Sequence, residues 1–298
     1  MNILITGGSG LVGKALTQKL QAKGHSVAWL TRHQNNITIN HFFWNIDSME
    51  IDLNAIEWAD VIIHLAGASI AQKRWDKSYK KEIYSSRINS TKLLISGIKK
   101  AHTPPQTLIC ASATGFYGSY ENHEGEYIEE NPAGKDFLAT LTKDWEHEIF
   151  SVNTTIRTTA LRIGIVLSKN GGAFKQIIQP IKYYVGAPLA SGQQTMSWIH
   201  LDDLTKMFLF IIENESISGV INAVSPLPVS NKEMTTQIAK HIKRPILLPH
   251  VPVFILSIVL GEFAQFATKG VRVSSKKIEN LGFKFKYPSL SEALKELI

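Results

Sequence analysis

The feature that most constrains the fold is a glycine-rich turn at the start of the chain, in the segment MNILITGGSGLVG. The apolar run NILIT precedes the turn, and LVGKALTQKLQAKG follows it. A short continuous apolar run is typical of a strand buried on both faces, and the spacing of the later segment predicts a helix. Gly7, Gly10 and Gly13 therefore stand between a predicted strand and a predicted helix, in the pattern G-x-x-G-x-x-G.

Glycine has a specific physical use at such a junction. A tight turn needs a residue that tolerates positive φ, and a phosphate can approach closely only where the backbone carries no Cβ. The helix that follows directs free N–H groups and the positive end of its dipole at the ligand. We predict a pyrophosphate site for a dinucleotide, and the alternative is a tight turn without a ligand. The residues expected to form this site are Gly7, Gly10, Leu11, Val12 and Gly13.

The order of segments predicts an α/β fold. Strand-like and helix-like segments alternate through the first half of the chain, with a long helix expected from about Trp75 to Lys100. Continuous apolar strands joined by helices are typical of a Rossmann-type, doubly wound parallel sheet. We expect this NADP-binding domain over residues 1–170. A smaller mixed α/β substrate lobe should cover residues 171–298, with a helical tail from about residue 249.

Composition excludes several classes of function. The 298 residues carry a net charge of +7 without any helix-turn-helix, zinc-finger or RNA-binding pattern, so we expect no nucleic-acid partner. The most apolar stretch, VPVFILSIVLGEFAQFA, is too short to span a bilayer, and we expect no signal peptide and no membrane partner. Cys110 is the single cysteine, which favours the cytoplasm, and no histidine or cysteine pattern indicates a metal.

The end of the second predicted strand indicates which nicotinamide cofactor is bound. Sheets that bind NAD place an acidic residue there for the ribose 2′-hydroxyl, but this chain has WLTRHQ. The guanidinium of Arg32 could instead hold a 2′-phosphate through paired hydrogen bonds. We therefore predict NADP(H), and the alternative is that Arg32 is an ordinary surface arginine.

Four motifs resemble those of the extended short-chain dehydrogenase/reductase superfamily: TGGSGLVG, HLAGA, SATGFYG and WIHLDDL. Within that superfamily the chain resembles the NAD-dependent epimerase/dehydratase-like proteins of the YfcH and SDR39U1 type. The segments that carry this closer resemblance are LAGASIAQKRW, SRINSTKLL, FLATLTKDWE and GGAFKQIIQPIKYYVGAPLASGQQTMSWIHLDDL. The resemblance covers essentially the whole chain.

The resemblance implies roles for several residues. Leu65, Ala66 and Gly67 should line the ribose region of the cofactor, and Asn89 should brace the central helix against the active site. Ser112 should contact the cofactor region and hydrogen-bond a substrate carbonyl or hydroxyl beside the nicotinamide; its alternative is a strand-end serine bonded to the backbone.

The same resemblance exposes a departure from the family's usual chemistry. Its members normally use Tyr-x-x-x-Lys, in which lysine lowers the pKa of the tyrosine and the phenol exchanges a proton with substrate. Alignment on Glu146 places Leu138 at the tyrosine position and Thr142 at the lysine position. Lys143 is one residue away, a rotation of about 100° on a helix. The usual proton-transfer pair is missing.

Tyr117 and His200 are the candidates to replace that pair, because each can carry a proton and each lies in a motif near the expected cleft. A packing role for Tyr117 and a structural role for His200 are the alternatives. Further titratable or cationic residues in segments that could face the cleft are Lys73, Arg74 and Glu146.

Two more residues are expected near the ligands. Arg162 ends a strand near the reactive end of the cofactor, and Trp198 could cover the substrate. Each has an alternative, a structural role for the arginine and core packing for the tryptophan.

These observations predict an NADP(H)-dependent oxidoreductase or epimerase that acts on a small carbonyl or sugar-like substrate. The alternative is an NADP(H)-binding redox sensor or regulatory protein with little or no turnover. The expected partner is a small-molecule substrate, and a homodimer is possible.

Overall fold

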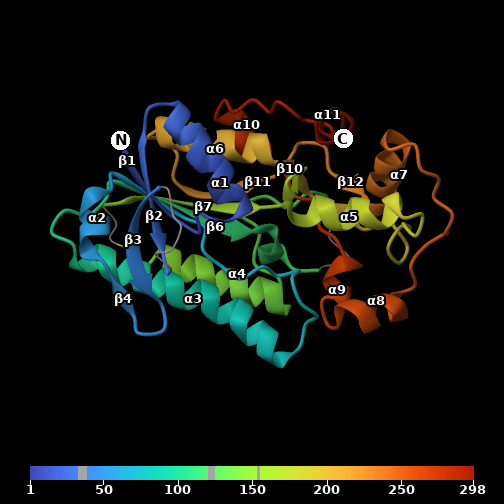
Figure 1. The fold of residues 1–298 in the computed structure, drawn as a ribbon, viewed down its shortest axis with the longest axis horizontal. Coiled ribbons are helices and arrows are strands. Elements are labelled where there is room, and N and C mark those ends of the chain that lie inside the picture. The colour runs from blue at the N-terminus through green and yellow to red at the C-terminus, as the bar shows by residue number, and fades with distance from the viewer. Residues whose placement is uncertain (33–38, 120–124, 153–154) are drawn as a thin grey trace.

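The computed structural model describes residues 1–32, 39–119, 125–152 and 155–298, which form two adjoining lobes (Figure 1). The larger lobe is built on a sheet with strand order β11-β7-β6-β5-β1-β2-β3-β4. All neighbouring strands are parallel except β3 and β4. This order is that of a doubly wound nucleotide-binding sheet, so the predicted fold class is confirmed. The strands are β1 (Asn2–Thr6), β2 (Ser26–Thr31), β3 (Asn40–Asn45), β4 (Glu50–Ile51), β5 (Val61–His64), β6 (Thr107–Ala113), β7 (Arg157–Ile163) and β11 (Gly219–Ala223).

The apolar run that opens the chain is explained by helices on both faces of this sheet. Ile3 and Ile5 pack into one buried cluster with residues of α1 and α6, and Leu4 packs into another with residues of α3 and α4. Alternate residues of a strand point to opposite faces, so a strand covered on both sides must be apolar throughout. Figure 1 shows these two helical layers above and below the sheet. The helices are α1 (Leu11–Ala22), α2 (Leu53–Trp58), α3 (Lys77–Lys100), α4 (Phe137–Ile149) and α6 (Leu201–Glu213).

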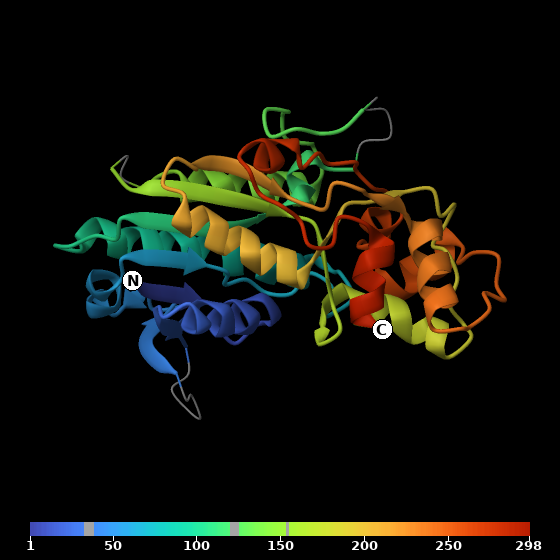
Figure 2. The same ribbon diagram turned by 90° about the horizontal axis from the view of Figure 1, so that it is seen from above.

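The smaller lobe packs its helices around a fully buried tryptophan. Trp198 contributes to a cluster with Phe174 of α5, Met234 of α7 and Leu294 of α11. Figure 2 shows this lobe beside the carboxyl edge of the sheet. Its elements are β8 (Ile165–Ser168), α5 (Gly172–Lys182), β9 (Thr195–Met196), β10 (Trp198–His200), β12 (Val229–Ser230), α7 (Asn231–His241), α8 (Val253–Leu260), α9 (Ala264–Ala267) and α11 (Leu290–Leu297). Helix α10 (Lys276–Asn280) packs on the larger lobe, where Ile278 joins the cluster of α1 and α6.

The two lobes do not separate at residue 170. After α5 the chain returns to the larger lobe, where α6 covers one face of the sheet and β11 pairs with β7 in parallel. Without β11, β7 would be an unpaired edge, and without α6 the face that carries Ile3 and Ile5 would be exposed. Residues 201–223 therefore belong with the sheet, and the second lobe is formed by the segments on either side of them.

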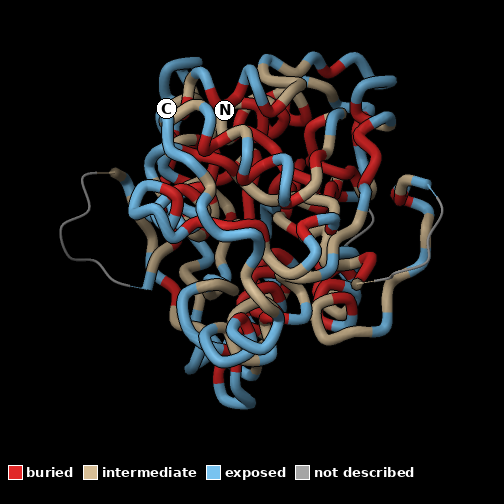
Figure 3. The backbone as a smooth tube through the Cα atoms, turned by 90° about the vertical axis from the view of Figure 1, so that its right-hand side faces the viewer, coloured by how far each residue is buried: buried red, intermediate tan, exposed pale blue. Residues whose placement is uncertain are grey.

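Burial follows this layered arrangement. Figure 3 shows buried residues concentrated in the interior and exposed residues along the outer loops and helices. No helix within the described ranges combines the length and the apolar character needed to cross a membrane.

A carboxylate at the start of α6 ties the C-terminal segment to the larger lobe. Asp203 is fully buried and accepts hydrogen bonds from the backbone N–H groups of Lys286 and Tyr287, at 2.8 and 2.9 Å. We expect Asp203→Asn to lower the free energy of unfolding by about 1–3 kcal/mol, because the amide replaces one acceptor with a donor that faces N–H groups. Urea denaturation measures the change. Asp47→Asn at an exposed turn is the control, and equal stability of the two variants would contradict this role.

Candidate functional site

The glycine-rich turn joins β1 to α1 through contacts that exclude side chains. Gly7 has φ +70°, and a Cβ there would lie 2.9 Å from the backbone carbonyl of Leu65. A Cβ on Gly13 would lie 2.4 Å from the carbonyl oxygen of Gly7. Gly10 donates its N–H to the same oxygen at 3.0 Å and precedes α1 without a side-chain cap. The first turn of α1, with Leu11 and Val12, contains no acidic residue and suits an anion.

One glycine of this turn was not singled out in the sequence motif. A Cβ on Gly8 would lie 2.4 Å from the indole ring of Trp29 on β2. The indole N–H donates to the hydroxyl of Thr17 on α1 at 2.9 Å, which fixes the ring beneath the turn. The second glycine of TGGSG was the available signal, but its partner on β2 could not be identified from spacing.

Arg32 lies directly after β2, next to β1 in the sheet, and is exposed. No hydrogen bond or ion pair to another described residue engages its side chain. The position at the carboxyl end of β2 is the one the sequence predicted, and binding of a 2′-phosphate there stays a prediction.

The segment after β5 is held against the glycine turn by a buried hydroxyl. Thr6 accepts hydrogen bonds from the N–H groups of Leu65 and Ala66, both at 3.1 Å. Its hydroxyl contacts Nδ1 of His64 at 2.7 Å, and Nε2 of His64 contacts the hydroxyl of Thr91 on α3 at 3.0 Å. Leu65, Ala66 and the following glycine are thereby placed beside the turn, as predicted for residues that line the cofactor.

Burial of His64 lowers its pKa to about 3, so the ring is neutral at physiological pH. A neutral ring with Nδ1 accepting from Thr6 must donate from Nε2 to Thr91. The hydroxyl of Thr91 also accepts from the indole N–H of Trp145 on α4 at 3.0 Å. One hydrogen-bonded chain thus connects the turn, α3 and α4.

Several predicted site residues meet in a closed polar cluster below the carboxyl ends of β6 and β7. Arg162 donates to both carboxylate oxygens of Glu146, at 2.9 and 2.8 Å. The hydroxyl of Ser112 donates to the same carboxylate at 2.6 Å. Arg162 also donates to the hydroxyl of Tyr117 at 2.9 Å, and that hydroxyl donates to the side-chain oxygen of Asn222 at 2.7 Å.

This cluster leaves little room for the expected proton transfer. Tyr117 lies in the 3-10 helix η1 (Thr114–Tyr117), is fully buried, and has a pKa raised to about 12 by burial. Ser112 is 3% exposed and uses its hydrogen on Glu146. The fold therefore brings Ser112, Tyr117 and Arg162 together, but their contacts are those of a structural cluster. The geometry does not support Tyr117 as the acid.

Helix α4 presents the two positions aligned with the usual tyrosine and lysine to η1. A Cβ on Gly115 would lie 3.3 Å from Cβ of Leu138 and 3.8 Å from the hydroxyl of Thr142. The Thr142 hydroxyl donates to the backbone oxygen of Leu138 at 2.7 Å. Lys143 is exposed on another face of the helix. The site thus has an apolar side chain and a threonine where a proton relay would stand.

His200 and Trp198 have structural partners. His200 caps α6, because its Nδ1 accepts from the N–H of Asp202 at 3.1 Å. Its Nε2 contacts Glu296 at 3.0 Å, and burial lowers its pKa. Trp198 is fully buried and donates from its indole N–H to the carbonyl of Leu227 at 3.1 Å. These contacts match the structural alternatives and do not support acid catalysis or substrate contact.

Two of the weaker cationic candidates lie on the surface. Lys73 pairs with Glu82 at 3.3 Å, and Arg74 donates to the carbonyl of Ile258 at 3.1 Å. Both are exposed and lie before α3.

Sequence reasoning missed two residues at this edge of the sheet. Asn89 is exposed on α3 and cannot brace the active site from there, whereas Arg87 extends to Gly67. Thr114 follows β6 and is partly exposed, and its hydroxyl has no hydrogen bond to another described residue. The motif SATGFYG contains this threonine, but the pattern alone did not separate it from Ser112.

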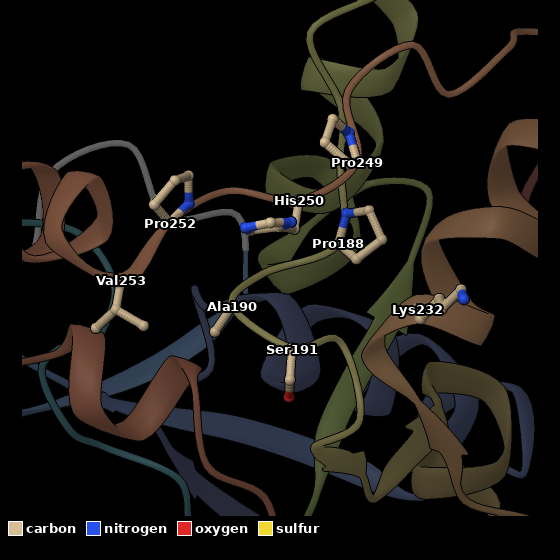
Figure 4. A pocket seen from close by; sticks show the side chains of 8 residues that line it. All are labelled: Pro188, Ala190, Ser191, Lys232, Pro249, His250, Pro252 and Val253. Carbon is tan, nitrogen blue, oxygen red and sulfur yellow. The ribbon is translucent and has the colours of Figure 1, made fainter.

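The smaller lobe carries a separate surface pocket of about 440 Å³ (Figure 4). Lys232 and His250 are its two ionisable lining residues, and no part of the glycine turn lines it. The remaining lining residues are Pro188, Ala190, Ser191, Pro249, Pro252 and Val253. This pocket is distinct from the edge of the sheet where the predicted site residues gather.

Comparison with known proteins extends over the whole chain. Residues 3–223 match the family model described as the NAD dependent epimerase/dehydratase family, and residues 251–297 match a domain of unknown function, DUF1731. The epimerase family protein YfhF of Bacillus subtilis is 39% identical, over 100% of this chain and 98% of its own length. The chloroplastic SDR39U1 homolog of Arabidopsis thaliana is 36% identical, over 100% and 87% respectively.

A solved structure agrees closely with this fold. The human epimerase family protein SDR39U1 (isoform 2), determined with NADPH, superposes with a TM-score of 0.90 at 28% identity. The match covers 100% of this chain and 99% of that chain.

The closed cluster generates a prediction about Tyr117. Tyr117→Phe removes the donor to Asn222 and an acceptor for Arg162, so we expect the free energy of unfolding to fall by about 1–3 kcal/mol. NADPH affinity should change less than twofold. Tyr183→Phe, at a residue that is 76% exposed, is the control for both measurements. An unchanged stability with a displaced pH profile of turnover would restore Tyr117 as the acid.

Proposed function

The chain belongs to the NAD dependent epimerase/dehydratase family, and we propose that it is an NADP(H)-dependent oxidoreductase or epimerase. Its substrate is a small molecule that bears a carbonyl group or resembles a sugar. The observation that carries the proposal is the glycine turn. Its glycines allow close backbone packing at the start of α1, which has no side-chain cap, and the exposed Arg32 lies after the neighbouring strand.

The residues present fit a dinucleotide. Gly7, Gly10 and Gly13 let the turn fold tightly against itself and Leu65, directly before the first turn of α1. Leu11 and Val12 in that turn offer backbone N–H groups for a pyrophosphate. Human SDR39U1, which shares this fold, was solved with NADPH, and this supports the same cofactor here. When bound, the cofactor supplies the hydride for reduction or oxidation of a substrate carbon.

The second half of the cofactor would lie over the carboxyl ends of β5 and β6. The crevice at the carboxyl edge of a doubly wound sheet is the general binding position for such ligands. Leu65, Ala66 and Gly67 follow β5 and would line the ribose beside the nicotinamide. Thr114 follows β6, is partly exposed, and has a hydroxyl without a hydrogen bond to another described residue. The hydroxyl of Ser112, in contrast, donates to Glu146. We therefore assign the orientation of the substrate oxygen to Thr114, with Ser112 beneath it as support.

A second function is favoured by one specific observation. Leu138 and Thr142 stand where the family's proton-transfer pair is expected, and the nearby carboxylate and phenol are locked in a closed cluster. A redox sensor would need cofactor binding without efficient proton transfer. Incubation of the protein and NADPH with a panel of carbonyl compounds and nucleotide sugars separates the two functions. Oxidation of NADPH by a carbonyl compound, or conversion of a nucleotide sugar into its epimer in the presence of NADP⁺, supports the enzyme. Cofactor binding without either reaction supports the sensor.

The cofactor preference is tested at Arg32. Arg32→Asp replaces a guanidinium with a repelling carboxylate, so we expect NADPH affinity to fall at least tenfold and NADH affinity to change less than threefold. Isothermal titration calorimetry measures both dissociation constants. Arg244→Asp makes the same charge change at an exposed site in the smaller lobe. Equal losses for both cofactors would refute Arg32 as the selector, and a wild type that prefers NADH would refute the cofactor assignment.

The roles of the Thr114 and Ser112 hydroxyls can be distinguished by the kinetics of variants. Thr114→Val should lower kcat at least tenfold without a change in NADPH affinity, because its hydroxyl orients substrate only. Ser112→Ala should mainly lower stability, because it removes a hydrogen bond to Glu146. The measurement is turnover with the best substrate of the panel, with thermal unfolding in parallel. A loss of kcat in Ser112→Ala alone would return the substrate contact to Ser112.

A further inference from the structure

Arg87 of α3 places its guanidinium against the segment that follows β5. A Cβ built on Gly67 would lie 3.3 Å from Cζ of Arg87. Because Gly67 has no side chain, the guanidinium can pack directly against the backbone of this segment. This position belongs to the edge of the sheet at which the cofactor site was described.

The surroundings of Arg87 leave most of its donors unused. Its Nη1 donates to the carbonyl of Ile83 at 3.0 Å, and the guanidinium lies 5.3 Å from the ring centre of Trp145 on α4. A guanidinium has five N–H donors. Within the described ranges no other hydrogen bond and no carboxylate partner engages it. Burial lowers its pKa to about 10, and the group stays charged at physiological pH.

An unpaired, partly buried guanidinium is costly, because it loses hydration without gaining a counter-charge. The neighbouring cation Arg162 shows the contrast, since its donors are taken up by Glu146, Tyr117 and a backbone carbonyl. Arg87 has the planar donor fork that matches a carboxylate or a phosphate, and in the described residues only one of its donors has a hydrogen-bond partner.

Arg87 also lies close to the part of α4 that carries Thr142. Thr142, at the position of the family's lysine, lies one turn of α4 before Trp145, the residue against which Arg87 packs. Helix α4 therefore has no lysine at this position, and Arg87 on α3 places a cation close to the same helix.

We propose that Arg87 is a binding residue for an anionic oxygen group, a carboxylate or a phosphate, held beside Gly67. The proposal rests on the proposed function in one respect: the ligand shares the edge of the sheet with the cofactor. Two sources supply this chemistry, a phosphate of NADP(H) and a carboxylate carried by the substrate.

The first arm of the test measures NADPH. Isothermal titration calorimetry compares wild type with Arg87→Gln and Arg87→Lys. Lys81→Gln removes the same charge from an exposed position on the same helix and is the matched control. A loss of tenfold or more in Arg87→Gln beyond that in Lys81→Gln, with a smaller loss in Arg87→Lys, supports the proposal with the cofactor phosphate as the ligand.

The second arm measures carboxylates on the protein saturated with NADP⁺. Oxalate and 2-oxoglutarate are the probes, and acetone is the carbonyl compound without a carboxylate. Binding of either acid that Arg87→Gln weakens at least tenfold and Lys81→Gln leaves within twofold supports the proposal with a substrate carboxylate as the ligand. Acetone affinity should not respond to the substitution.

The proposal is overturned if Arg87→Gln matches Lys81→Gln in NADPH affinity and no probe shows binding that depends on Arg87. Thermal unfolding of Arg87→Gln checks its fold, and Arg87→Lys provides the same comparison should the glutamine variant be unstable. The proposed function fails separately, through a wild type that binds no NADPH. A wild type that binds NADPH and is indifferent to Arg87 refutes this inference alone.

Discussion

The buried ion pair between Arg162 and Glu146 is the interaction on which the carboxyl edge of the sheet depends. Two hydrogen bonds of 2.9 and 2.8 Å join β7 to α4, and both side chains are less than 10% exposed. A pair buried this deeply is tolerated only when its remaining donors and acceptors are satisfied, and removal of one partner typically costs about 3–5 kcal/mol. Ser112 on β6 donates a hydrogen bond to Glu146, and Tyr117 on η1 accepts one from Arg162. The residues that could have performed proton transfer are thereby committed to holding α4 against the sheet.

Local patterns were sufficient for the doubly wound sheet but not for its last strand. The apolar runs of β1, β5 and β6 are continuous because helices cover both faces, and that signal is contained within each segment. In contrast, β11 pairs with β7 after the intervening chain has built part of the smaller lobe. Gly164 also separates β7 from β8, and a Cβ there would lie 2.5 Å from the carbonyl oxygen of Ser197. Both features depend on contacts between distant segments.

The roles of the side chains at the site also depend on contacts between distant segments. Motif spacing predicted that Ser112, Tyr117 and Arg162 lie near one another. Their contacts depend on Glu146, which only the folded chain brings beside them. Asn89 and Arg87 differ by two helical positions, a rotation of about 200°. That rotation separates an exposed face from one that meets Gly67, and sequence alone did not fix which face points inward.

The distribution of charge gives this edge of the sheet its chemical character. The acidic groups near it are occupied: Glu146 by Arg162, Asp203 by two backbone N–H groups, and Asp202 by Lys19 of α1. Arg32 and Arg87, in contrast, engage no carboxylate of the described residues. Because Arg32 and Arg87 have no carboxylate partner among the described residues, they leave positive charge at this edge, and the dipole of α1 adds to it. An edge of this kind attracts ligands that carry negative charge on oxygen at more than one point along their length. A dinucleotide phosphate with an acidic substrate beside it meets that requirement, whereas a neutral carbonyl compound would leave the second guanidinium unpaired.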